Sequence, residues 1–290
     1  MSNWKTEWKD LFQIIPDSNW LIDLHQHIST PMLCSGNINN DGSIIKNGWM
    51  WKGPYYSECG DDGVLEYLFK YINKKNKFAV DIGASSGYGG SNVRFLVDRY
   101  DWGSVEFDSA SKWGRIHSRV KKKKTITRDN VCEELKEHET PKEFDLLSLD
   151  IDSMDWYVLK SLLEGGFNPS VAIIEYNPIF NHDESYVRCY SEKFSKNKTS
   201  AYGASLRAYE KLFNEHNYTL VGNVADIENK IYSNNAIFLN NKFIRDNDVV
   251  QTIEELHPKA WVEHWKTKNN SDDISEIKNK LIKNEIMESF

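Results

Sequence analysis

Short apolar runs alternate with amphipathic segments along the middle of this chain, from about residue 56 to residue 245. Runs that are apolar almost throughout are typical of strands buried on both faces, as in parallel sheets covered by helices. The sequence therefore predicts an α/β fold with a mostly parallel sheet and helices on both faces. Strands are expected at residues 78–82, 102–108, around Ile126, 144–152, 171–177, 218–222 and 235–239, and helices at 62–73, 92–99, 156–163 and 204–213.

Two flanking regions have a different character from this central domain, residues 56–245. Residues 1–55 are rich in Trp, Asn and Gly and show little periodicity, which predicts an N-terminal arm or lid. Residues 246–290 are expected to form a C-terminal helical extension, because ISEIKNKLIKNEIMESF has apolar residues at helical spacing.

Charge and composition exclude several classes of partner. The formal net charge is −7, so nothing in the overall balance favours nucleic acid or an anionic membrane. Apolar runs fall short of the ~18 residues of a membrane span, and the N-terminus lacks an apolar signal core, so we expect a cytoplasmic protein. The four cysteines contain no CxxC pair, which fits reduced thiols.

The stretch FAVDIGASSGYGGSN, residues 78–92, is the clearest local motif. A short apolar strand reaches Asp81 and opens into a loop whose glycines permit positive φ angles and close approach of a ligand. The glycine spacing departs from the GxGxxG pattern that seats a pyrophosphate on a helix N-terminus. An acidic residue before the loop suits a ligand with an ammonium group instead. The alternative is a tight strand-to-helix turn that binds nothing.

Acidic residues also stand at the expected ends of three further strands: Glu106, Asp150 with Asp152, and Glu175. The carboxyl ends of parallel strands meet at one edge of a sheet, where ligands bind. Glu106 suits a vicinal diol, since a carboxylate can accept hydrogen bonds from two hydroxyl groups. An ammonium group together with a ribose diol predicts S-adenosylmethionine as the cofactor.

These motifs resemble the class I S-adenosylmethionine-dependent methyltransferases, and among them the FkbM-like O-methyltransferases. The resemblance covers roughly residues 56–240 and implies a Rossmann-like, doubly wound, mostly parallel seven-stranded sheet. It implies an O-methyltransferase that acts on a hydroxyl group of a sugar, a glycan precursor or another small polar molecule. The matching stretches are SECGDDGVL (57–65), VDIGASSG (80–87), SN (91–92), VEFD (105–108), FDLLSLDIDSMDW (144–156), IIEYNP (173–178) and YGASL (202–206).

The resemblance assigns the cofactor to residues at the ends of the first three strands. Asp81 and the backbone of the following loop would hold the methionine part, and Glu106 would bind the ribose hydroxyls. Asp129 and Asn130 would face the adenine, although Asp129 is an equally good candidate for the N-cap of a helix at VCEELK. The loop residues are Gly83, Ala84, Ser85, Ser86 and Gly87.

A second cluster offers oxygen ligands from two adjacent strand ends: Asp150, Asp152, Glu175 and Asn177. Hard divalent cations such as Mg²⁺ or Mn²⁺ take such oxygen sets, and a bound ion lowers the pKa of a hydroxyl group. The alternatives are Asp150 or Asp152 as a general base without metal, or carboxylates bonded to loop backbone. His182, in the loop after the fifth strand, is either a further candidate base or a solvated loop residue.

Two other function classes share the expected fold. A nicotinamide-dependent oxidoreductase would have the same sheet, but this chain lacks its glycine fingerprint. A module that binds the cofactor without transferring a methyl group fits the cofactor motifs. The expected partner is a small-molecule acceptor, and a homo-oligomer is compatible with the sequence. The N-terminal arm and residues 178–201 are expected to close over the acceptor, with Tyr202 beside them or at the start of a helix.

Overall fold

The computed structural model describes most of the central domain and two short C-terminal segments. The predicted N-terminal arm, residues 1–55, and the predicted cofactor residue Ser86 lie outside the described residues. The described residues are 56–57, 61–72, 76–85, 87, 90–109, 120–152, 154–191, 202–226, 231–244, 253, 274–283 and 287–290.

Seven strands form one sheet in the order β3-β2-β1-β4-β5-β8-β7. Neighbouring strands are parallel except at β8, which runs antiparallel to both β5 and β7. The predicted α/β class with a mostly parallel sheet is thus confirmed. The strands are β1 (Phe78–Ile82), β2 (Gly103–Asp108), β3 (Val120–Lys123), β4 (Glu143–Leu149), β5 (Asn168–Glu175), β7 (Tyr218–Asp226) and β8 (Ile231–Asn240).

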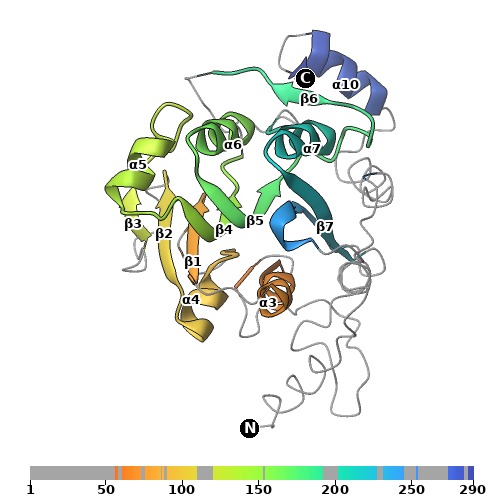
Figure 1. Cartoon of the computed structure of the whole chain (residues 1–290). Coiled ribbons are helices and arrows are strands. Elements are labelled where there is room, and N and C mark those ends of the chain that lie inside the picture. The colour runs from red at the N-terminus through yellow and green to blue at the C-terminus, as the bar shows by residue number, and fades with distance from the viewer. Residues whose placement is uncertain are drawn as a thin grey trace, which may run out of the picture.

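Helices cover both faces of this sheet (Figure 1). One face packs against α3 (Asp61–Tyr71) and α4 (Arg94–Tyr100) through a core that includes Leu65 and Leu96. The other face carries α5, α6 and α7, which share a larger core. Their bounds are α5 (Val131–Glu137), α6 (Asp155–Glu164) and α7 (Leu206–Glu215), and a 3₁₀ turn, η2 (Asn241–Phe243), follows β8.

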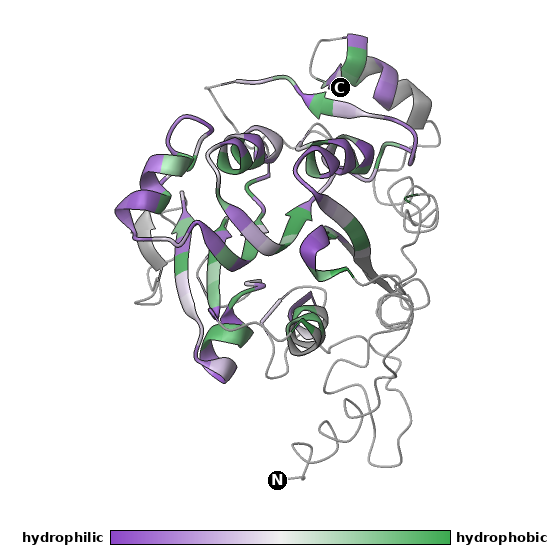
Figure 2. Cartoon of the chain, viewed as in Figure 1, coloured by the Kyte–Doolittle hydropathy of each residue, from purple (hydrophilic) through white to green (hydrophobic). Residues whose placement is uncertain are grey.

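The central strands are apolar at consecutive positions because both of their faces are covered. Phe144 to Leu149 of β4 are all buried, as are Pro169 to Ile174 of β5, because helices lie on both sides of these strands. The hydropathy colouring shows apolar residues in the sheet and mostly hydrophilic residues on α5 (Figure 2). No helix among the described residues has both the length and the apolar character that crossing a membrane requires.

The strand order reverses between β1 and β4. From β1 the chain proceeds outward to β2 and β3, and it then returns to place β4 on the opposite side of β1. Such a reversal leaves a crevice at the carboxyl ends of the two strands, which is where open α/β sheets bind ligands. The register brings Asp81 of β1 level with Glu106 of β2 and Ser148 of β4.

The third strand lies earlier in the chain than predicted. It spans Val120–Lys123 at the edge of the sheet, whereas Ile126 lies in the connection to α5. Ile126 is buried and packs into the core under α5 and α6. The prediction was wrong because an apolar residue that anchors a loop looks in sequence like one from a short strand.

The last described residues of the chain are also not helical as predicted. The last helix, α10 (Ile274–Lys283), ends well before the end of the predicted amphipathic segment. Residues Met287–Ser289 form strand β9, which pairs antiparallel with β6 (Tyr186–Arg188) in a second sheet. Pairing with β6 and burial of Met287 therefore override the helical pattern of this segment.

Candidate functional site

The loop after β1 is held tightly between the ends of β2 and β4. The backbone N–H groups of Gly83 and Ala84 both donate to the carbonyl of Phe107, at 2.9 and 3.1 Å. Gly83 has φ +100, and a Cβ atom there would lie 1.6 Å from the carbonyl oxygen of Asp150. The loop therefore needs glycine at this position because its backbone touches the end of β4.

Asp108 is the acid that stands at the end of β2. Its Oδ2 accepts a hydrogen bond of 2.8 Å from the backbone N–H of Ser85, which itself adopts a left-handed φ of 52°. Glu106 lies two positions earlier and is buried, and its Oε1 accepts a 2.7 Å hydrogen bond from the hydroxyl of Ser104. The sequence interpretation chose the wrong acid of the VEFD motif as the strand end, although the motif contains both.

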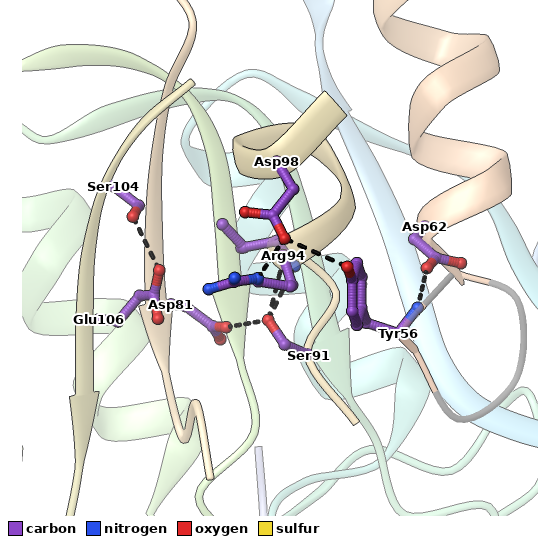
Figure 3. Close-up of polar contacts among 9 residues, drawn as sticks. Tyr56, Asp62, Asp81, Ser91, Arg94, Asp98, Ser104 and Glu106 are labelled. Atoms are coloured by element: carbon purple, nitrogen blue, oxygen red, sulfur yellow. Dashed lines mark hydrogen bonds and ion pairs between the residues drawn. The ribbon is translucent and has the colours of Figure 1, made fainter. Parts of the chain in front are cut away.

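Asp81 lies beneath the loop rather than at its surface. The residue is 3% exposed, and its Oδ2 accepts a 3.1 Å hydrogen bond from the hydroxyl of Ser91. Burial, and then the neighbouring Glu106, raises the pKa of Asp81 to about 7. Figure 3 shows Asp81, Glu106 and Arg94 converging from β1, β2 and α4. Asp81 therefore belongs to a buried polar cluster under the loop.

The first backbone amides of α4 are already occupied. The hydroxyl oxygen of Ser91 accepts from the N–H groups of Val93 and Arg94, at 3.2 and 3.1 Å. The Arg94 side chain is buried and its Nε donates to Asp98 at 2.6 Å. The N–H groups at the N-cap and the first position of α4 are thus occupied by Ser91, which disfavours a pyrophosphate at this helix start.

Three of the four predicted metal ligands come together at the ends of β4 and β5. Asp150, Asp152 and Glu175 each bring one carboxylate oxygen within 4.8 Å of the others. Asp152 has a left-handed φ of 62°, which aspartate tolerates better than most residues. Asp155, at the start of α6, fixes this loop because its Oδ1 accepts a 2.8 Å hydrogen bond from the N–H of Ile151.

Glu175 is the most constrained member of this group. Its Oε1 accepts a 2.7 Å hydrogen bond from Nδ2 of Asn234, whereas its Oε2 is buried and has no donor among the described residues. Burial, and then the negative charge of Asp150, raises the pKa of Glu175 well above its usual range. A divalent cation would supply the positive charge that three close carboxylates lack, so the donor set fits a hard cation.

Asn177 has other contacts. Its Nδ2 donates to the carbonyl of Tyr202 at 3.1 Å, and its Oδ1 accepts from the N–H of Ile179 at 3.2 Å. Its own N–H donates to the carbonyl of Ala204 at 2.8 Å. These contacts hold residues 202–204 against the end of β5, and the role of Asn177 as a metal ligand stays a prediction.

His182 does not lie in the group formed by Asp150, Asp152 and Glu175. It lies in the loop between β5 and β6, and its backbone carbonyl accepts a 2.9 Å hydrogen bond from Nε of Arg207. This contact fixes the backbone of the loop to α7. A role of His182 as the catalytic base stays a prediction.

The two residues predicted to face adenine lie just before α5. Asp129 is exposed, and its carboxylate accepts a 3.3 Å hydrogen bond from the hydroxyl of Tyr190. Asn130 closes a turn, because its Oδ1 accepts from the N–H of Thr127 at 2.8 Å and its Nδ2 donates to the carbonyl of Thr125 at 3.0 Å. Of these two residues, Asp129 is exposed and Asn130 is half-buried.

Asn234 and Tyr202 are the residues of this site that sequence reasoning missed or left open. Asn234 lies on β8 and contacts both Glu175 and the hydroxyl of Tyr202. Nothing in the stretch SNNA distinguishes Asn234 from an ordinary polar residue at a strand end. Its role becomes visible only because β8 pairs with β5 in the folded sheet.

No protein-family model and no curated protein matches this chain. The function is therefore inferred from the site itself.

Proposed function

We propose that this chain is an S-adenosylmethionine-dependent O-methyltransferase with a divalent cation at Asp150, Asp152 and Glu175. The acceptor is a hydroxyl group of a small polar molecule, such as a sugar. The observation that carries the proposal is the backbone contact between Gly83 and Asp150. It joins the loop after β1 to the acidic group at the point where the strand order reverses, so a cofactor and an acceptor would lie side by side there.

The loop after β1 favours S-adenosylmethionine over a dinucleotide. The amides of Val93 and Arg94 at the start of α4 are bonded to Ser91, and the surrounding carboxylates would repel a pyrophosphate. Asp108 is half-buried at the strand end and suits a ribose diol, so we assign the ribose to Asp108 instead of the buried Glu106. When bound, S-adenosylmethionine supplies an activated methyl group.

The acidic group would prepare the acceptor hydroxyl. A divalent cation at this group supplies a Lewis acid that lowers the pKa of the hydroxyl when both are bound. The chain contributes rigid ligands: the N–H of Asp150 donates to the carbonyl of Ile82 at 2.9 Å, and Glu175 is held by Asn234. Oxygen ligands alone suit Mg²⁺ or Mn²⁺ better than softer metals.

Calorimetry with S-adenosylmethionine tests the cofactor assignment. Asp108→Asn should weaken binding about 10- to 100-fold, because a charged acceptor for the ribose diol is lost while an oxygen remains for the N–H of Ser85. Glu164→Gln, an exposed acid on α6, is the control and should leave the affinity unchanged.

Methyl transfer from labelled cofactor to a panel of sugars and catechols tests the reaction. Transfer should stop in EDTA and return with Mg²⁺ or Mn²⁺. Absence of cofactor binding would refute the proposal, whereas binding without transfer to any acceptor would favour a cofactor-binding module.

A further inference from the structure

We propose that Asn234 is a positioning residue, whose side-chain amide holds Glu175 in the orientation that a divalent cation requires and ties it to Tyr202. The inference rests on the proposed metal site and extends it to a residue outside the ligand set. It is drawn from the three contacts of one amide group.

The amide nitrogen of Asn234 has three oxygen neighbours. It lies 2.7 Å from Oε1 of Glu175, 3.3 Å from the carbonyl of Tyr176 and 3.1 Å from the hydroxyl of Tyr202. A carboxylate and a backbone carbonyl only accept hydrogen bonds, so the atom that faces them must be the nitrogen. The chemistry of the neighbours thus fixes which way the amide points.

The backbone of Asn234 is fixed as well. Its carbonyl accepts a 2.8 Å hydrogen bond from the N–H of Tyr176, next to Glu175 at the end of β5. The amide therefore reaches Glu175 from a strand that is bonded to the strand of Glu175 itself. Such a short and rigid connection limits rotation of the carboxylate.

The bond to Oε1 decides which oxygen remains for a cation. With Oε1 held by Asn234, the buried Oε2 is the atom without a donor among the described residues. Residues that orient a ligand in this way typically change metal affinity about 10- to 100-fold when they are removed. We expect a loss of this size when Asn234 loses its amide.

Tyr202 completes the arrangement. The hydroxyl oxygen of Tyr202 is the third neighbour of the amide nitrogen, at 3.1 Å. Burial keeps the pKa of Tyr202 well above its usual range, so the hydroxyl stays a donor at neutral pH.

Mn²⁺ binding to the full chain, followed by electron paramagnetic resonance, tests the proposal without any turnover. Asn234→Ala should weaken Mn²⁺ about 10- to 100-fold and alter the spectrum of the bound ion. Asn234→Leu keeps the side-chain size and should show the same loss, which guards against a folding defect in the first variant. The control Asn168→Ala changes an asparagine at the opposite end of β5 and should leave the affinity unchanged.

A double-mutant cycle with Glu175→Gln shows whether Asn234 acts through Glu175. In the Glu175→Gln background, Asn234→Ala should cause no further loss, because the oriented carboxylate is already gone. Tyr202→Phe keeps the bond between Asn234 and Glu175 and should change Mn²⁺ affinity by less than about threefold.

Three outcomes would overturn the inference. They are full Mn²⁺ affinity in both Asn234 variants, additive losses in the cycle, and a larger loss in Tyr202→Phe than in Asn234→Ala. Absence of Mn²⁺ binding to the unaltered chain would refute the metal site as well, so the two failures can be told apart.

Discussion

Asp81 and Glu106 place two carboxylates next to each other in the interior. They are level in the pairing of β1 with β2, and both are almost fully buried. The hydroxyl groups of Ser91 and Ser104 each donate to one of them, which offsets part of the cost of burial. The remaining cost appears as the raised pKa of Asp81, about 7.

The stability of the fold should depend on the ionisation of Asp81. The unfolded pKa of aspartate is about 3.9, so between roughly pH 4 and pH 7 only the folded chain holds this proton. Stability therefore falls as pH rises through this window, by up to about 1.4 kcal/mol per pH unit. Asp81→Asn keeps an acceptor for Ser91 but cannot ionise. The free energy of unfolding of this variant, taken relative to that of the unaltered chain, should therefore be roughly 2–3 kcal/mol more favourable at pH 8 than at pH 5.

Urea unfolding at the two pH values measures this difference. Glu164→Gln, which changes an exposed acid, should give a difference close to zero. An advantage of Asp81→Asn that is equal at both pH values, or larger at pH 5, would contradict the role assigned to Asp81.

Single residues of the site were predicted to different degrees. Asp150, Asp152 and Glu175 were found from sequence because each follows an apolar run that is long enough to be a buried strand. Glu106 was placed at the end of β2, where the structure has Asp108, because a shift of two positions keeps the same face of a strand and alternation cannot separate the two acids. Asn234 could not be found, since its partner on β5 is far away in the sequence.

Ser205 shows how elements are joined beside the site. It is fully buried, and its hydroxyl oxygen accepts from the N–H of Tyr186 on β6 at 3.0 Å and of Ala208 in α7 at 3.3 Å. Ser205→Ala leaves the N–H of Tyr186 without this acceptor, and we expect a loss of about 1–3 kcal/mol in the free energy of unfolding.

Urea unfolding and hydrogen exchange at the amide of Tyr186 check the Ser205 prediction. The matched control is Ser161→Ala in the neighbouring helix α6, which should change stability by less than about 0.5 kcal/mol. Unchanged exchange at Tyr186 in Ser205→Ala would show that the serine does not hold β6.

Helices and strands that a local sequence pattern indicates were predicted well. The positions of β1, β4, α6 and α7 follow from continuous apolar runs or helical spacing, and the structure confirms them within a few residues. The strands β6 and β9 were not predicted, because each is three residues long and exists only through its pairing with the other. Tertiary pairing of this kind leaves no periodic pattern in a short segment.

The whole molecule carries a net negative charge, and part of this charge is concentrated at one edge of the sheet. The chain has a formal net charge of −7, so any salt stabilises it somewhat by screening self-repulsion. The three carboxylates at the ends of β4 and β5 concentrate part of that charge, and they form the one group of three or more possible metal ligands in the described part of the chain. A specific cation effect must therefore be separated from this general salt effect.

Mn²⁺ should raise the thermal stability of the whole chain by more than screening can explain. A ligand that binds only the folded state stabilises it by about 2.7 kcal/mol at 100 times its dissociation constant. Sodium chloride at the same ionic strength is the control for screening, and Asp152→Asn is the control for the site, because asparagine tolerates the left-handed φ of this position. In a thermal scan, the unaltered chain should gain several degrees with Mn²⁺ over sodium chloride, and Asp152→Asn should lose most of that gain. Equal shifts with both salts, or an unchanged Mn²⁺ effect in Asp152→Asn, would show that the acidic group binds no cation and that its charge is balanced by protons instead.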